Sequence, residues 1–258
     1  MPLDEYRRKR DFKTSPEPTG AAKKPRRPPK RALTFCVQKH LASHLHYDLR
    51  LEHRGVLLSW AVPKGPSLDP SVKRLAMHVE DHPIEYGSFE GLIPDGYGAG
   101  IVMLWDEGTW TPEVDDVDAA LAKGDLKFTL DGYKLKGSWV LVRTRGYGGT
   151  RGEGRSWLLI KHRDEWSGDL DILEFAPVSV KTSHDFPEIL ADEDPAVWTA
   201  NPPSGGGEAG AMLRDIVEKA ATLVLEREAA KKPRAKRTKT RRTSSRKTPA
   251  RKRKSTRR

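Results

Sequence analysis

The chain has 258 residues, of which 36% are hydrophobic and 32% charged, and its formal net charge is +11. It can therefore bury one hydrophobic core, but it must also contain segments that do not contribute to a core. A single cysteine excludes an internal disulfide and a cysteine-rich zinc site. No apolar run is long enough to cross a membrane, and the first residues, MPLDEYRRKRDF, lack the apolar stretch of a signal peptide. We expect a soluble cytoplasmic protein with no membrane partner.

The positive charge lies at the two ends of the chain. Residues 1–31 hold 11 Lys/Arg against 4 acids, and residues 231–258 hold 16 Lys/Arg and no acid, whereas residues 32–230 carry 20 basic and 32 acidic residues. A long basic run with almost no apolar residue cannot cover a core. We therefore expect 231–258 to be a disordered tail that binds nucleic acid through counterion release, and 1–31 to be a shorter, partly disordered basic arm. A tail that only aids solubility is the alternative.

Between these ends the hydrophobic pattern predicts mainly strands. Apolar and polar residues alternate in seven segments separated by turns rich in Gly and Pro, namely 46–52, 56–62, 74–80, 100–110, 126–132, 134–144 and 156–162. Short helices are predicted over 114–124, ended by Gly124, and over 185–192. Many short strands without long alternating helices indicate a mainly β fold, with an antiparallel sheet curled into a barrel or a sandwich. The tryptophans expected in its core are Trp60, Trp105, Trp110, Trp139 and Trp157.

The predicted domain covers residues 32–183, and residues 184–208 form an extension that ends in a Gly-rich linker. In the following segment, 209–230, apolar residues recur at helical spacing. This amphipathic helix is expected to pack on the domain or to self-associate, and a dedicated partner-binding helix is the alternative.

The segment HLASHLHYDLRLE, residues 40–52, gathers three histidines, an aspartate and an arginine. On a strand, side chains alternate between two faces, so the apolar residues face a core and the polar row shares the other face, where it holds His44, His46, Asp48, Arg50 and Glu52. Solvent exposure is the simple interpretation of that row. However, His46 and Asp48 can present an imidazole and a carboxylate to one cation, and His40 lies just upstream.

A second group of polar residues follows in HVEDHPIEY, residues 78–86, where His78, Glu80 and His82 alternate and Tyr86 follows. The pattern permits two enzymes. His46, Asp48 and His82 could form the facial triad of a non-haem iron oxygenase. Alternatively, two histidines and Asp48 hold a manganese-type ion that polarises a phosphoryl group, with Arg50 neutralising its oxygens. The basic ends favour the second enzyme, because its substrate would be nucleic acid.

Residues 35–91 resemble the phosphoesterase domain of the bacterial ligase D family, which acts in non-homologous end joining. The resemblance continues through IPDGYGAGIVMLWDEGTW, KFTLDGYKLKGSWVLVRT and WLLIKHRDEW, and RDFKTSPEP at 10–18 resembles the N-terminal motif of the family. It covers about residues 7–183, and the chain resembles the stand-alone form, without ligase or polymerase motifs.

The resemblance implies a compact β-barrel that heals 3′ ends with manganese. Such a domain removes a 3′-phosphate and, on ribonucleotide-ended strands, a terminal ribonucleoside. The implied partners are DNA 3′ ends, RNA-ended primer-templates and a separate ligase, polymerase or Ku-type end-binding protein. We expect a nucleoid-associated monomer. The alternative is a catalytically weak nucleic-acid-binding module that recruits repair partners.

The resemblance also assigns roles to particular residues. His40, His46 and Asp48 match the metal ligands. Arg50 and His82 match residues that contact the scissile phosphate, and a protonated His82 could donate to a phosphoryl oxygen. His82 and Tyr86, which matches a tyrosine that the activity needs, are the candidates for protonating the leaving oxygen. The remaining matches are Lys64 and Arg74, at basic positions near the substrate, and the supporting residues Arg10, Asp11 and Glu17, to which Glu80 is added as a group that orients the ligands.

Overall fold

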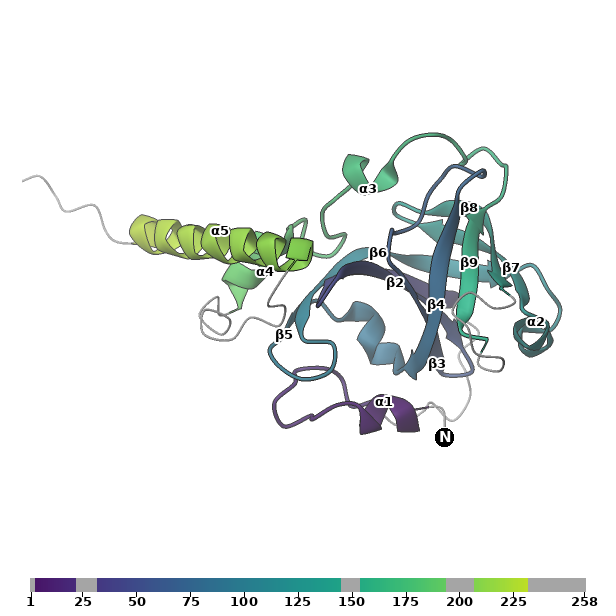
Figure 1. Ribbon diagram of the computed structural model, residues 1–258, viewed down its shortest axis with the longest axis horizontal. Coiled ribbons are helices and arrows are strands. Elements are labelled where there is room, and N and C mark those ends of the chain that lie inside the picture. Colours follow the sequence, from purple (N-terminus) through teal and green to yellow (C-terminus); the bar gives the residue numbers. More distant parts are fainter. Residues whose placement is uncertain (1–2, 22–31, 145–153, 194–206, 232–258) are drawn as a thin grey trace, which may run out of the picture.

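The computed structural model describes residues 3–21, 32–144, 154–193 and 207–231 (Figure 1). Within these ranges the strands are β1 (Leu33–Leu41), β2 (Leu45–His53), β3 (Val56–Val62), β4 (Lys73–His82), β5 (Gly91–Ile93), β6 (Gly100–Pro112), β7 (Asp125–Gly132), β8 (Lys136–Arg143) and β9 (Ser156–Lys161). The helices are α1 (Asp4–Arg8), the 3-10 helix η1 (Ile84–Ser88), α2 (Val117–Lys123), α3 (Ile172–Phe175), α4 (Phe186–Asp192) and α5 (Gly207–Lys231).

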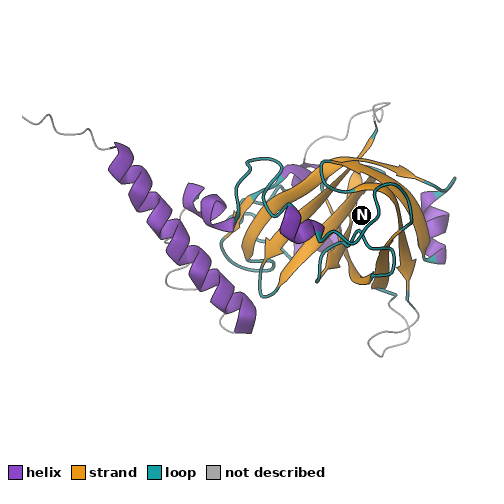
Figure 2. Ribbon diagram, turned by 90° about the horizontal axis from the view of Figure 1, so that it is seen from above, coloured by secondary structure: helices purple, strands orange, loops and turns teal. Residues whose placement is uncertain are grey.

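The strands form one antiparallel sheet in the order β1-β2-β3-β4-β9-β8-β7-β6-β5. A further pairing of β1 with β6 closes eight strands into a barrel, and β5 adds to the free side of β6. Figure 2 shows the curled sheet from above, with α4 and α5 at one end. The mainly β fold is confirmed, and of the two architectures left open by the strand pattern the structure has the barrel. Closure removes the exposed edges that an open sheet would present.

The barrel interior holds the main hydrophobic core. On each strand the side chains alternate between the interior and the outer face, so on β1 and β2 the core receives Phe35, Val37, Tyr47, Leu49 and Leu51. The five tryptophans predicted for the core are all 2% exposed or less, namely Trp60, Trp105, Trp110, Trp139 and Trp157.

The outer face of β1–β4 is also covered, which the sequence did not reveal. The segment that contains α1, together with η1, packs there through a second cluster made of Tyr6, Leu57 and Tyr86. In Figure 1, α1 (purple) lies across the open side of the curve formed by these strands. The polar row of β2 therefore faces a covered, partly enclosed space rather than bulk solvent, and its members Asp48 and Arg50 are only 6% and 3% exposed.

The helices begin and end at residues that satisfy their terminal backbone groups. Asp116 caps α2 by accepting from two backbone N–H groups, and Gly124 ends it in the left-handed region at φ 82°. Asp185 and Glu188 form a capping box at the start of α4. These caps account for the helices predicted over 114–124 and 185–192.

The long helix α5 occupies the segment predicted as helical over 209–230. It packs against α4 (Figure 1), and Leu213, Ile216 and Ala220 join the main core cluster. Of the residues that the structure describes, no helix is both long and apolar enough to span a membrane. Three parts of the chain lie outside the described residues: the Gly-rich linker up to residue 206, the KKPRRPPKR part of the basic arm and the basic tail beyond Lys231.

Candidate metal and phosphate site

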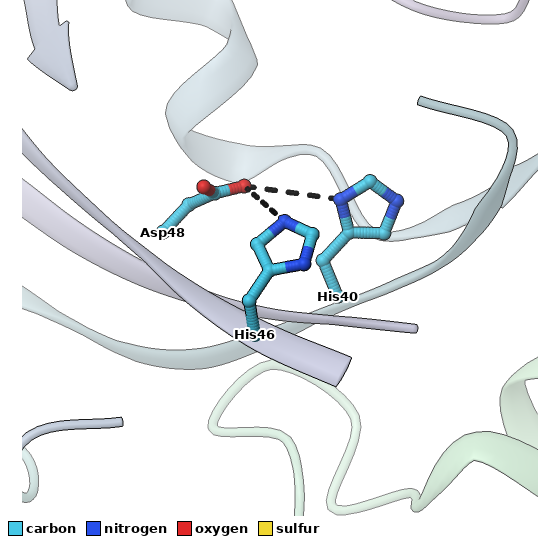
Figure 3. A group of neighbouring side chains, drawn as sticks. All are labelled: His40, His46 and Asp48. Carbon is cyan, nitrogen blue, oxygen red and sulfur yellow. Dashed lines mark ion pairs between the residues drawn. The ribbon is translucent and has the colours of Figure 1, made fainter. Parts of the chain in front are cut away.

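His40, His46 and Asp48 lie together on the outer face of β1 and β2. His40 and His46 are directly paired across the two antiparallel strands, and Asp48 follows His46 on the same face. One ligand atom from each residue lies within 4.8 Å of the others. Figure 3 shows both imidazoles turned toward the Asp48 carboxylate. His40 lies near the end of β1, a strand that the sequence analysis did not predict.

Hydrogen bonds to backbone carbonyls orient both imidazoles. His40 Nε2 lies 2.9 Å from the Gly98 carbonyl oxygen, and His46 Nδ1 lies 2.9 Å from that of His44. A carbonyl only accepts, so in each ring the nitrogen beside the carbonyl carries the proton. The other nitrogen, Nδ1 of His40 and Nε2 of His46, is then left with a free lone pair, and both face Asp48. Metal-ligating histidines are commonly oriented in this way.

The spacing of these atoms, all within 4.8 Å of one another, is close to that of ligands around one shared cation. Asp48 Oδ2 lies 3.8 Å from His40 Nδ1 and 3.7 Å from His46 Nε2, too far for direct hydrogen bonds. Ligands that each lie about 2.1 Å from one ion are roughly 3–4 Å apart. Burial acts to lower the pKa of both histidines, and at His40 it outweighs the opposing influences, so the pKa of His40 lies below its usual value. At His46 the attraction of the Asp48 carboxylate outweighs burial, so the pKa of His46 lies above its usual value. The same attraction would hold a cation.

Arg50 lies beside this group and keeps Asp48 ionised. Its Nη2 donates to Asp48 Oδ2 at 3.0 Å. Burial acts to raise the pKa of Asp48, but the Arg50 guanidinium and His46 outweigh it and hold that pKa well below its usual range. Asp48 is therefore a carboxylate at neutral pH and can serve as an anionic ligand.

Two residues that the sequence analysis did not single out hold Arg50 in place. Arg50 Nε donates to Gln38 Oε1 at 2.7 Å, and Nη1 donates to Ser59 Oγ at 2.9 Å. Gln38 and Ser59 are fully buried, at 0% exposed. Gln38 Nε2 in turn donates to the carbonyls of Tyr86 and Phe89, at 3.0 and 2.8 Å, and so ties η1 to the barrel. A polar residue between hydrophobic neighbours on a strand was the available signal for both.

The N-terminal segment contributes a second arginine. Arg10 Nε donates to Glu17 Oε1 at 2.8 Å, its Nη1 donates to Glu80 Oε1 at 3.1 Å, and its Nη2 lies 3.1 Å from His82 Nε2. The side chains of Arg10, Glu17 and Glu80 are at most 5% exposed. Two buried carboxylates thus fix the guanidinium at the site, and Arg10 lies more than 60 residues from its partners on β4.

The surroundings of His82 favour its neutral form, whereas the sequence analysis allowed for a protonated His82 as a donor. Its Nδ1 lies 2.8 Å from the Glu80 carbonyl oxygen, which assigns the ring proton there, and its Nε2 accepts from Arg10. Burial and the positive charges of Arg50 and Arg10 hold the pKa of His82 well below its usual range. His82 therefore presents an acceptor to the cavity.

Tyr86 keeps its proton in this environment. It is 2% exposed, and the Arg50 guanidinium lies 4.8 Å from its ring centroid. Burial and the nearby Glu17 carboxylate raise the pKa of Tyr86 well above its usual value, although Arg50 and Arg10 oppose the shift. Its hydroxyl can therefore act as a hydrogen-bond donor over the whole neutral range.

These groups line one cavity of about 410 Å³. Besides the three metal-ligand candidates, it is lined by Arg10, Glu17, Arg50, Glu80, His82, Tyr86 and Tyr97. A cavity with two arginines, a neutral imidazole and a candidate cation site can surround a phosphoryl group on several sides.

Other expected site residues lie away from this cavity. Lys64 is exposed on the loop after β3, and Arg74 lies near the far end of β4; neither lines the cavity. Asp11 is also exposed and accepts from the Lys13 backbone N–H at 3.0 Å, so it shapes the turn before Glu17. His44 is exposed and contributes only its carbonyl oxygen.

The three alternating residues of β4 do not share a face, contrary to the sequence pattern. His78 packs against Trp60 and Trp157, with ring centroids 5.1 and 6.4 Å away, while Glu80 and His82 line the cavity. The pairing of β3 with β4 shifts register between Leu57 and Ser59, and such a bulge reverses the alternation. His82 also stands apart from the metal-ligand candidates, so the iron-oxygenase triad is not assembled.

Comparison with known proteins identifies related sequences. Residues 38–143 match the family model described as the DNA ligase D 3′-phosphoesterase domain. The multifunctional non-homologous end joining protein LigD of Pseudomonas aeruginosa is 50% identical over 230 residues, 86% of this chain and 26% of that protein. The protein of the same name from Mycobacterium bovis is 46% identical over 145 residues, 56% of this chain and 18% of that protein. The chain thus spans about a quarter or less of the length of these relatives.

Proposed function

Because the chain carries a 3′-phosphoesterase domain of the DNA ligase D family, we propose that it is a hydrolase that heals 3′ ends of DNA for repair by non-homologous end joining. The groups removed are a 3′-phosphate and a terminal 3′-ribonucleoside. The observation that carries the proposal is the cavity in which His40, His46 and Asp48 lie beside Arg50. Its proposed partners are DNA ends and a separate ligase, polymerase or end-binding protein.

His40, His46 and Asp48 are the proposed holders of a divalent metal ion, with manganese as the preferred ion. Their free ring nitrogens and the ionised carboxylate form a donor set that fits such an ion. When bound, the ion would neutralise phosphoryl oxygens and lower the pKa of a coordinated water.

Arg50 and Arg10 bind and orient the phosphoryl group. The hydrogen bonds of Arg50 to Gln38, Ser59 and Asp48 engage three of its five N–H groups. Arg10 is held by Glu17 and Glu80 in the same way. Since both guanidinium groups are fixed before substrate arrives, little side-chain order remains to be imposed on binding, and both can donate charge-assisted hydrogen bonds to phosphoryl oxygens.

His82 and Tyr86 take different proton roles in this proposal. The neutral His82 offers Nε2 as a hydrogen-bond acceptor, which Arg10 Nη2 engages, so it has no proton to donate from that nitrogen. Tyr86 keeps its hydroxyl proton and is the candidate to donate to the leaving oxygen or to a phosphoryl oxygen. The assignment differs from the sequence-based one, in which both residues were candidate donors.

Cleavage of a primer-template with a 3′-phosphate or a terminal ribonucleotide tests the proposal. His46→Ala should lower kcat/KM by at least about 100-fold in the presence of manganese, because it removes one of three ligands. His44→Ala is the matched control, since it removes an exposed imidazole two residues away and leaves the carbonyl that orients His46. Equal activity of the two variants would contradict the metal assignment, and no product from wild type with any divalent metal would contradict the function.

A further inference from the structure

Tyr97 lies at the mouth of the cavity on the loop between β5 and β6. Its side chain is among those that line the cavity, and it is 51% exposed. The other strongly exposed aromatic residues that the structure describes, Tyr133, Trp166 and Phe175, do not line it. Single exposed aromatic residues are common on protein surfaces, so the informative feature of Tyr97 is its position at the cavity and not its exposure.

The loop presents this ring in a defined place. Gly96 and Gly98, on either side of Tyr97, have φ values of 84° and 81°, a region that side chains other than glycine rarely adopt. The Gly98 carbonyl accepts from His40 Nε2 at 2.9 Å. The residue next to Tyr97 is therefore bonded directly to a metal-ligand candidate, so the ring and the reaction site are held together.

Two cations of the N-terminal segment lie against the ring. Lys9 Nζ is 4.8 Å and Arg10 Cζ is 5.7 Å from its centroid. Lys9 is itself held by Glu80 at 2.9 Å and Glu5 at 3.0 Å. These cation–π contacts steady the tyrosine without covering it, because about half of its surface stays open.

We propose that Tyr97 is a stacking platform for the nucleobase of the 3′-terminal nucleotide, an inference that rests on the proposed function. A 3′ end whose phosphoryl group lies between Arg50 and Arg10 leaves its last base at the cavity mouth. Every base has a flat π face, so an aromatic platform holds the end without reading its sequence. This is the selectivity that a general end-healing enzyme requires.

Kinetics with base-bearing and abasic ends separate this role from a structural one. Loss of one base–aromatic stack weakens binding by roughly 5- to 150-fold. Tyr97→Ala should therefore raise KM about tenfold or more for a 3′-phosphate on a normal terminal nucleotide, and by less than about twofold on an abasic one. Tyr97→Phe should behave as wild type. Tyr133→Ala is the matched control, because Tyr133 is 74% exposed and lies outside the cavity.

A binding measurement tests the platform independently of turnover. A strand with 2-aminopurine at its 3′ terminus should lose fluorescence on binding wild type, Tyr97→Phe and Tyr133→Ala, and should keep it with Tyr97→Ala. The same probe four nucleotides inward should not distinguish the variants. Equal quenching by wild type and Tyr97→Ala, or an equal rise in KM for base-bearing and abasic ends, would overturn the proposal. If wild type quenches the probe but releases no phosphate, the platform stands and the proposed function fails.

Discussion

Replacing Gln38 with methionine tests whether one buried amide holds the site together. The two side chains have similar size, so the change removes polar atoms and leaves the volume nearly unchanged. It deletes the bonds to the carbonyls of Tyr86 and Phe89 and the acceptor for Arg50 Nε. Each buried group left without a partner costs about 1–3 kcal/mol. After partial relaxation, we expect the free energy of unfolding to fall by about 3–6 kcal/mol.

Urea denaturation of Gln38→Met and wild type measures this loss. Thr34→Val is the control, because Thr34 lies on the same face of β1 and its hydroxyl makes one bond, to Glu52 at 2.6 Å; it should cost about 1 kcal/mol. The kcat of Gln38→Met should also fall, since Arg50 loses an anchor. A loss below about 1 kcal/mol with an unchanged m value would refute the reasoning, because the three groups would then have other partners.

Three further predictions concern the N-terminal arginine, a buried acid and the basic tail. Arg10→Lys should lower kcat about tenfold or more, since an ammonium cannot reach Glu17, Glu80 and His82 together. In the same steady-state assays the control Arg7→Lys, at an exposed arginine, should have a kcat near that of wild type. Equal effects of the two substitutions would contradict a role for the guanidinium group of Arg10. Burial raises the pKa of Asp81 from 3.8 to about 6, so the folded state binds more protons than the unfolded state in that window and stability falls as pH rises through it. Urea titrations should accordingly show Asp81→Asn more favourable relative to wild type at pH 7.5 than at pH 4.5, and a difference that does not change with pH would show that Asp81 ionises normally. Deleting residues 231–258, with their 16 Lys/Arg, should weaken DNA binding and reduce its dependence on salt concentration, while leaving cleavage of a short oligonucleotide unchanged. Fluorescence anisotropy at several salt concentrations measures this dependence, and the same dependence with and without the tail would contradict a tail that binds DNA.

Much of the barrel could be predicted because its strands direct apolar side chains to the interior at every second position. The segments 46–52 and 56–62 alternate clearly, and the structure has β2 and β3 there. The first strand was not predicted, because both of its faces are buried and its sequence, LTFCVQKHL, does not alternate cleanly between apolar and polar residues. Closure of the barrel by β1 and β6 is a long-range pairing that no local pattern specifies.

The site was only partly predictable for a related physical reason. His46, Asp48 and Arg50 share a face by strand alternation, which local sequence determines. The cover over that face comes from η1 and from residues near Arg10, and only the tertiary fold brings Arg10 to Glu80. The register shift in β4, which separates His78 from His82, likewise depends on pairing with β3.

The most direct test of the central claim is release of inorganic phosphate by wild-type protein from matched primer-templates that carry the phosphate at the 3′ or the 5′ end, with manganese or with EDTA. We predict release from the 3′ end alone, in the presence of manganese alone. Equal release from both ends, or release that persists in EDTA, would contradict a metal-dependent 3′-end phosphoesterase built on His40, His46 and Asp48.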